Sequence, residues 1–192
     1  MNADELALCE TFPATLQHEA ETLILRQPYR SRLSVLQGET VVSDGQTIRL
    51  IRRQYAAFHA KGDEVRQLMA HCLNTRHHDG HVRERYFKQL LAAGQPEFVL
   101  PFAAQLLGEY VLPIQFDVAV FFRHNAAALA RFFADNPLYG QKLKNRIRSY
   151  WHYYHSSRYP DWQSYPVCLL AEKIDKEIAH IVFRRPHTPN VV

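Results

Sequence analysis

From residue 62 onward, apolar residues recur at three- and four-residue spacing, and glycine or proline interrupts the pattern at short intervals. This spacing places apolar side chains on one face of an α-helix, and glycine and proline mark where helices end or begin. Glycine is otherwise scarce, at 7 of 192 residues, whereas aromatic residues make up 12%. Such a balance suits packed helices better than turn-rich sheets, so we predict an all-α fold.

The same part of the chain contains local signals for the individual helices. Asp63 and Asp79 stand where helices begin, and Asp is a preferred N-cap residue. Gly94 suits the end of one helix and Pro96 the first turn of the next. Asn136-Pro137 separates two later helices. The expected helices cover about residues 62–73, 79–91, 96–107, 112–124, 126–134 and 139–155, and a last one runs from about 162 or 166 to 183.

The turn signal Asp44-Gly45 admits two alternatives. In the first, Val41-Val42 and Thr47-Ile48 form a β-hairpin across this turn. In the second, Asp44 caps a helix whose apolar residues have helical spacing, namely Ile48, Ile51, Tyr55 and Phe58. The helical pattern is longer and includes Ala56-Ala57, so we favour the helix. No strand is expected after residue 60.

The expected helices have short loops and broad apolar faces, so successive helices should pack as antiparallel hairpins. Stacked hairpins form an α-solenoid, and a compact helical bundle is the alternative. We expect one domain over 1–192, with an irregular region over 1–60 that holds short helices at 4–8 and 16–25. The predicted core is Val65, Leu68, Leu73, Val82, Phe87, Leu90, Leu91, Val99, Leu100, Leu106, Leu107, Val111, Ile114, Val118, Phe122, Leu129, Phe132, Leu143, Ile147, Tyr150, Ile174, Ile178 and Ile181.

One segment carries a resemblance to a known architecture. The sequences DGHVRERYFKQLL at 79–91 and LPFAAQLLGEYV at 100–111 resemble the repeats of bacterial HEAT-like proteins, over about residues 79–115. In those repeats a turn with glycine and then Val/Ile-Arg-Glu opens one helix; Gln115 departs from the pattern, which often has arginine there. The resemblance implies a short HEAT-like α-solenoid. It also implies that Arg83 and Glu84 are structural residues that hydrogen-bond to neighbouring repeats.

Charge is distributed unevenly along a chain whose net charge is +4. Residues 1–25 contain five acidic residues and no Lys or Arg, whereas residues 136–160 contain five Lys or Arg and no acid. On a helix these bases form two ridges that could hold phosphates, or simply the solvated face of an amphipathic helix. The candidate basic surface is Lys142, Lys144, Arg146, Arg148, His152, His155 and Arg158.

Other constellations point away from catalysis and from a metal centre. Five potential ligands lie between His71 and His81, but Asp79-Gly80 starts a helix too late for these side chains to converge. Asp117 interrupts an apolar run and is expected to be a structural or exposed acid. No Gly-rich phosphate loop, nucleophile elbow or His-Glu-x-x-His motif occurs. We therefore expect neither metal nor cofactor.

The remaining features bear on location and function. No apolar run approaches the roughly 20 residues that span a bilayer, and the acidic start is unlike a signal peptide. Three separated cysteines suit a reducing compartment, so we expect a cytoplasmic protein. The expected function is a non-enzymatic helical-repeat module that binds a protein or peptide. The alternative is nucleic-acid binding through the basic helix, which the resemblance extends to base repair, as in some HEAT-like DNA glycosylases.

Overall fold

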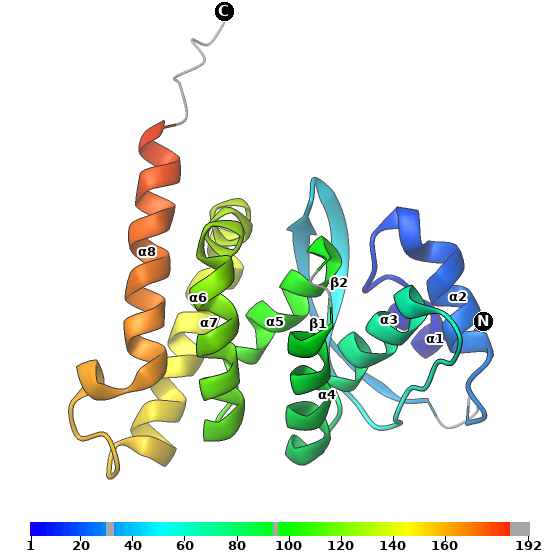
Figure 1. The fold of residues 1–192 in the computed structure, drawn as a ribbon, viewed down its shortest axis with the longest axis horizontal. Coiled ribbons are helices and arrows are strands. Elements are labelled where there is room, and N and C mark those ends of the chain that lie inside the picture. The colour runs from blue at the N-terminus through cyan, green and yellow to red at the C-terminus, as the bar shows by residue number, and fades with distance from the viewer. Residues whose placement is uncertain (30–32, 94–95, 185–192) are drawn as a thin grey trace, which may run out of the picture.

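The computed structural model describes residues 1–29, 33–93 and 96–184. Figure 1 shows its elements side by side along the long axis, from α1 and α2 at one end to α8 at the other. The helices are α1 (Ala3–Cys9), α2 (Gln17–Leu25), α3 (Glu64–Asn74), α4 (Gly80–Ala92), α5 (Leu100–Leu106), α6 (Leu112–Asp135), α7 (Pro137–Tyr150) and α8 (Pro166–Arg184). Short helical turns are η1 (Ala14–Leu16), η3 (Glu97–Val99), the π-helical η4 (Trp151–His155) and η5 (Trp162–Ser164).

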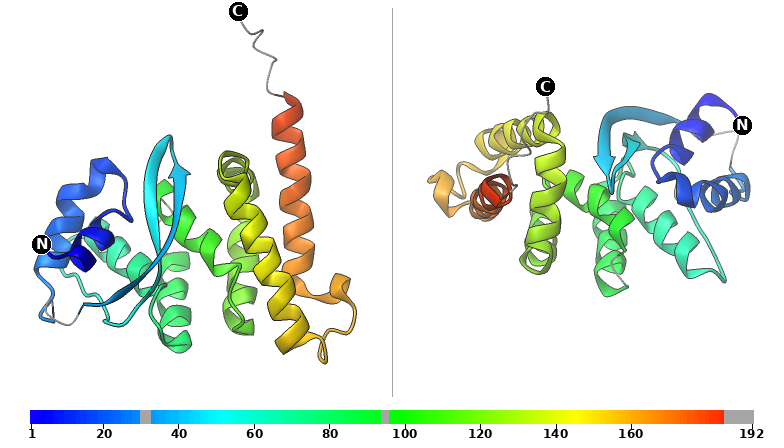
Figure 2. Two further views of the ribbon diagram at one scale, coloured as in Figure 1. Left: turned by 180° about the vertical axis from the view of Figure 1, so that it is seen from behind. Right: turned by 90° about the horizontal axis from the view of Figure 1, so that it is seen from above.

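The prediction of an all-α fold, as a short α-solenoid or as a compact bundle, is wrong. Two nine-residue antiparallel strands, β1 (Val35–Ser43) and β2 (Gln46–Gln54), form a long hairpin where a helix was favoured. The hairpin alternative across Asp44-Gly45 is therefore the correct one. Over the described residues the fold is mixed, with helices on either side of a two-stranded sheet (Figure 2). The resemblance of residues 79–115 to HEAT-like repeats concerns two helices only and stays a prediction.

Local backbone geometry explains the hairpin. Asp44 and Gly45 both have positive φ, at 50° and 70°, which is the conformation that a two-residue hairpin turn of type I′ requires. The register shifts near Gly38, where a Cβ would collide with the carbonyl oxygen of Leu50. Beside this irregularity two consecutive residues, Leu50 and Ile51, are both buried. The three-residue spacing of Ile48 and Ile51 thus comes from an irregular strand and not from a helix.

The hairpin connects the two ends of the molecule, and both views in Figure 2 place it between the N-terminal helices and α6–α7. The Arg49 N–H donates to the carbonyl of Glu10, which follows α1, over 2.8 Å. At the end of β2, the Gln54 N–H donates to the Arg76 carbonyl, and the His78 N–H donates to the Gln54 carbonyl, each over 2.9 Å. The sheet is therefore bonded to the N-terminal helices and to the loop after α3.

Most helix signals after residue 60 are confirmed. Asp63 and Asp79 are N-caps whose carboxylates accept backbone N–H groups of α3 and α4. The two helices expected over 112–134 are continuous as α6 but kinked at Asn125, where φ is −122°. Pro137 begins α7, which continues into η4. Gly94, the expected end of a helix, lies outside the described residues.

The core is largely as predicted, with identifiable errors. Val65 is 39% exposed, because it lies on the outer side of α3. Several expected core residues are only half-buried: Leu68, Val82, Leu91, Leu100, Val111, Tyr150 and Ile178. The side chains of Ile174 and Ile181 lie outside the described part. Buried residues that the prediction omitted come mainly from the N-terminal third, among them Phe12, Leu23, Leu50 and Phe58.

Candidate functional site

An apolar groove lies between α7 and α8. Helix α8 packs along α6 and against η5, and beside it α7 leaves a groove of about 340 Å³. The floor is apolar and comes from α6, α7, α8 and Leu107, the residue that follows α5. The lining residues are Leu107, Phe133, Ala134, Pro137, Gly140, Gln141, Leu143, Lys144, Ile147, Ala171, Asp175 and Ile178. This volume falls within the range of about 300–1,000 Å³ typical of ligand pockets.

Helical spacing and small side chains account for the groove. On α7, Gly140, Lys144 and Ile147 recur at four- and three-residue spacing, so they line one face. On α8, Ala171 and Ile178 lie on one face for the same reason. Gly140 is packed closely, since a Cβ there would lie 3.2 Å from the Phe133 ring. Gly140 thus allows α7 to approach Phe133 of α6 closely, and Ala134 and Ala171 contribute only small side chains to the groove.

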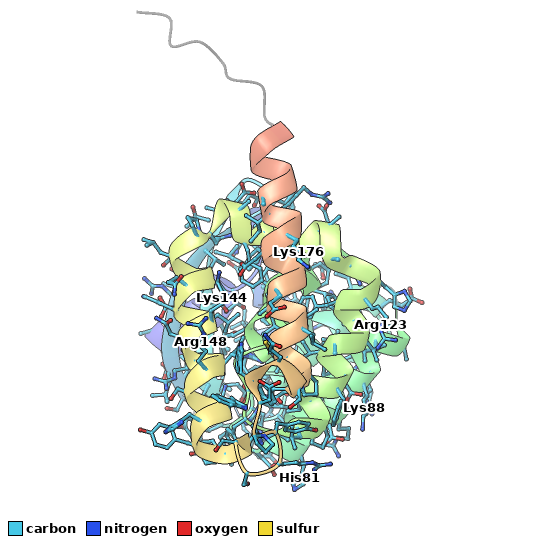
Figure 3. All side chains as sticks on the ribbon, turned by 90° about the vertical axis from the view of Figure 1, so that its left-hand side faces the viewer. His81, Lys88, Arg123, Lys144, Arg148 and Lys176 are labelled. Carbon is cyan, nitrogen blue, oxygen red and sulfur yellow. The ribbon has the colours of Figure 1, made fainter. Side chains whose placement is uncertain are left out.

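Charged side chains lie on the two helices that flank the groove. Figure 3 shows Lys144 and Arg148 on α7 and Lys176 on α8, and Lys144 is among the residues that line the groove. The Lys144 Nζ lies 2.8 Å from Asp175 Oδ1, so an ion pair joins the two helices. Arg148 lies over the Trp162 ring, 6.0 Å from its centroid. Within the described part of the chain, neither Arg148 nor Lys176 is in an ion pair. These two cations therefore lie outside the ion pairs of the described residues, on the helices that flank the groove.

The residues of the predicted basic surface do not form one continuous patch. Lys142 pairs with Glu39 of β1 at 2.8 Å, and Lys144 pairs with Asp175 on the other side of α7. Arg146 is half-buried, Arg148 and Arg158 lie over Trp162 and Tyr159, and His152 is exposed. His155 is buried, stacked on Tyr165, with Nε2 2.8 Å from the Tyr110 carbonyl oxygen. Their binding role stays a prediction.

A cluster of tyrosines on the surface is a feature that the sequence pattern did not reveal. The ring of Tyr110 lies 5.9 Å from that of Tyr150 and 5.4 Å from that of Tyr154, and the last two are 5.8 Å apart. Tyr110 and Tyr154 are 45% and 60% exposed. Tyr154 belongs to the π-helical turn η4, a feature frequent at functional sites. Tyr110 comes from a loop, so spacing on α7 alone could not show the cluster.

The histidines between α3 and α4 are held by ring contacts. His71 packs against Tyr86, and the rings of His77 and His78 lie 4.4 Å apart. Burial lowers the pKa of His71 and of His77, with the neighbouring His78 as a further cause for His77. Cys72 is fully buried. No three His, Cys, Asp or Glu side chains of the described residues are grouped so that they could hold a metal ion.

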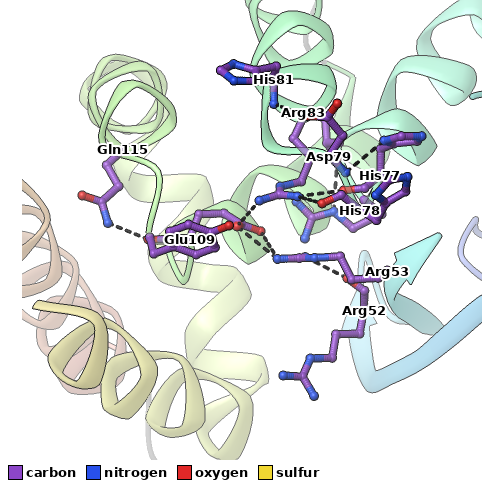
Figure 4. A network of polar contacts seen from close by, with 12 residues as sticks. Arg52, Arg53, His77, His78, Asp79, His81, Arg83, Glu109 and Gln115 are labelled. Carbon is purple, nitrogen blue, oxygen red and sulfur yellow. Dashed lines mark hydrogen bonds and ion pairs between the residues drawn. The ribbon is translucent and has the colours of Figure 1, made fainter. Parts of the chain in front are cut away.

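A buried network of arginines surrounds Glu109, drawn in Figure 4. Arg83 Nη1 donates to the carbonyls of His77 and His78, both at 2.8 Å, and these residues follow the end of α3. Arg83 Nη2 lies 3.0 Å from Glu109 Oε2, and Arg53 Nη2 lies 2.9 Å from Glu109 Oε1. The sequence did not identify Glu109, because its partners lie on other elements.

Glu84 and Asp117, the two acidic residues considered in the sequence analysis, lie nearer the surface than Glu109. Glu84 pairs with Lys88 one turn further along α4, at 2.6 Å. Asp117 is half-buried, 3.9 Å from Lys88 Nζ. Burial raises the pKa of Asp117, and Lys88 acts in the opposite direction. These three charges therefore form a side-chain network between α4 and α6.

Comparison with protein-family models, with curated proteins and with solved structures finds no match for this chain. Among the described residues, no helix combines the length and apolar character needed to cross a membrane.

Proposed function

We propose that this protein is a non-enzymatic binding module that holds an amphipathic helical peptide of another protein in the α7–α8 groove. The observation that carries the proposal is the groove itself, about 340 Å³ with Leu107, Phe133 and Ile147 among its lining residues. Amphipathic helices bind in such grooves by inserting apolar side chains from successive turns. A groove of this size accommodates a few such side chains, and the rest of the peptide would lie along α7 and α8.

The charge around the groove favours an acidic peptide. Glu39 and Asp175 are already paired with Lys142 and Lys144 of α7. Arg148 and Lys176 therefore remain to attract carboxylates from a partner, within the part of the chain that is described. Complementary charges of this kind increase the association rate and select among partners. A cytoplasmic location belongs to the same proposal, supported by three thiols that form no disulfide.

A phage-displayed library of helical peptides tests this function. We expect selection on the immobilised protein to enrich peptides with one apolar face and flanking acidic residues. Ala171→Trp fills the groove and should weaken a selected peptide at least about tenfold in fluorescence anisotropy. Leu169→Trp is the matched control, since Leu169 is on the same helix, 59% exposed and outside the groove lining. Enriched peptides that bind Ala171→Trp and wild type equally, or no enrichment, would contradict the proposal.

A second candidate function, binding of single-stranded nucleic acid, is favoured by the tyrosine cluster. Arg146 lies one turn before Tyr150 on α7, and its side chain packs at Gly108, two residues from Tyr110. Exposed aromatic rings stack on bases, and adjacent cations bind phosphates. On this basis we expect the phosphates of a nucleic acid to contact the face of α7 that carries Arg146, and not the face that carries Lys144 and Arg148.

The test of this second function is a titration of a labelled oligothymidylate, followed by anisotropy at about 50 and about 200 mM salt. Tyr110→Ala with Tyr154→Ala should abolish binding at the lower salt concentration. Tyr153→Ala is the matched control, because Tyr153 is 75% exposed yet its ring contacts only His152 among the described aromatic pairs. Equal affinity in the double variant and wild type would eliminate the cluster as a nucleic-acid site.

A further inference from the structure

Arg76, in the loop after α3, has an unusual environment. Its side chain is 0% exposed, and it is among the largest fully buried side chains of the protein. The Nε donates a 3.3 Å hydrogen bond to Thr75 Oγ1. Neither Nη1 nor Nη2 has a hydrogen-bond partner in the described part of the chain. These two nitrogens carry four of the five N–H donors of a guanidinium, and buried donors without partners are costly.

The charges around Arg76 do not balance. Glu109, Arg53 and Arg83 all interact electrostatically with it. The Glu109 carboxylate is already shared by the other two arginines, at distances of 2.9 to 3.1 Å. One carboxylate thus interacts electrostatically with three guanidiniums, of which it contacts Arg53 and Arg83, and Arg76 and Arg83 are almost fully buried. Uncompensated buried charge is strongly destabilising, so this interior favours an additional negative charge.

Tyr139 of α7 offers a further donor near the same place. Its side chain is 7% exposed, and its hydroxyl oxygen has no hydrogen-bond partner among the described residues. Tyr139 interacts electrostatically with Arg76, so the two groups lie within range of each other. Burial raises the pKa of Tyr139, which keeps the hydroxyl protonated. A protonated phenol donates a hydrogen bond to an anion.

We propose that Arg76 and Tyr139 bind a small monovalent anion of the halide class, chloride in solution, inside the protein. An anion accepts hydrogen bonds from the Arg76 Nη groups and the Tyr139 hydroxyl, and it also reduces the excess positive charge. A water molecule would accept the same bonds but leave the charge uncompensated. Because Arg76 and Tyr139 are buried, the site selects an ion without bulky substituents. The site joins the end of α3 to α7, so its occupation should stabilise the fold.

Chloride-dependent stability tests the site. Unfolding is measured in urea with sodium chloride or sodium gluconate at matched ionic strength, because gluconate is too large to enter. Above its dissociation constant, a tenfold increase in chloride should raise the folding equilibrium constant by up to about tenfold. Tyr139→Phe and Arg76→Met should each reduce this chloride effect. The matched control Arg52→Met alters an exposed arginine of β2 and should leave the effect unchanged.

Bromide provides a direct readout that does not depend on the stability of any variant. Crystals of the wild-type protein grown in sodium bromide should show an anomalous peak within hydrogen-bond distance of the Arg76 Nη atoms. Equal stability in chloride and gluconate, or a chloride effect that persists in Tyr139→Phe and Arg76→Met, overturns the proposal. Bromide peaks at the surface with none at Arg76 overturn it as well.

Discussion

Asn136 is hydrogen-bonded in both directions to the backbone of Val42. The Val42 N–H donates to Asn136 Oδ1, and Asn136 Nδ2 donates to the Val42 carbonyl, each over 2.7 Å. The same Nδ2 also donates to the Phe132 carbonyl at 2.8 Å. The side-chain amide of Asn136, between α6 and α7, therefore makes the two hydrogen bonds that a neighbouring strand would make to β1 at Val42. The two residues are 94 positions apart in the sequence.

Replacing Asn136 tests this connection. Asn136→Ala leaves the Val42 N–H and carbonyl without these partners in a partly buried place, and each such loss costs about 1–3 kcal/mol. We expect urea unfolding to show a decrease in the free energy of unfolding of about 2–4 kcal/mol. Asn145→Ala, at an exposed position of α7, is the control and should change stability little. A decrease as small as that of the control would show that the hairpin does not depend on Asn136.

Glu109 is expected to be indispensable for stability. Glu109→Gln leaves Arg83 and Arg53 without their carboxylate, and breaking a buried ion pair costs about 3–5 kcal/mol. The loss is measured by urea denaturation near neutral pH. Glu84→Gln removes an acid of a surface pair and should have a far smaller effect. Comparable effects of the two variants would contradict a buried network.

The core substitutions distinguish the inward from the outward faces of the helices. Leu90→Ala and Leu106→Ala each remove a side chain that is at most 1% exposed, so each should cost about 2–5 kcal/mol. The control Val65→Ala removes apolar atoms from a residue that is 39% exposed. Denaturant titration should therefore show a much smaller change for Val65→Ala. A cost below about 1 kcal/mol for Leu90→Ala would mean that α4 packs with another face inward.

The three cysteines should be unreactive in the native protein. Cys9, Cys72 and Cys168 are at most 1% exposed. Burial raises the pKa of Cys9 and of Cys168 to about 11, and raises that of Cys72 further, so little thiolate forms. Ellman's reagent should detect almost no thiol in the native protein and all three thiols in denaturant. Rapid native labelling of Cys72 would contradict the packing of α3.

Stability should decrease with acidification because of His71 and His77. Burial lowers the pKa of each below its ordinary value of 6.5. The folded state then binds protons more weakly than the unfolded chain. The contribution of these two histidines to the free energy of unfolding is therefore complete above pH 6.5, and it is lost as the pH falls towards the lowered pKa. We expect a lower free energy of unfolding at about pH 5.5 than at about pH 7.5.

The variant His71→Gln removes one of these titrating groups and should reduce the pH dependence. His152→Gln, at an exposed position, serves as the control. Unfolding curves at the two pH values for each variant provide the measurement. A pH dependence that His71→Gln leaves unchanged would show that His71 does not contribute to it.

Short-range interactions made the helices after residue 60 predictable. Asp63 and Asp79 accept hydrogen bonds from N–H groups two or three residues ahead, so the signal and its partner are neighbours in the sequence. Pro137 begins α7 because its missing N–H is not needed in the first turn. Periodic apolar residues such as Leu90 and Leu106 then indicated which face is buried. These features depend on a few adjacent residues, and the sequence alone determined them.

Tertiary structure decided the remaining features, because their partners are distant in the chain. The spacing of Ile48 and Ile51 fits a helix or an irregular strand, and contacts such as that of β1 with Asn136 accompany the strand. The groove depends on how α8 packs relative to α7, and the tyrosine cluster depends on where the loop with Tyr110 lies. In the sequence nothing distinguishes Glu109 from the other acidic residues, because the two arginines that contact it lie on other elements. Such contacts follow from the packing of whole elements, which no local pattern of residues encodes.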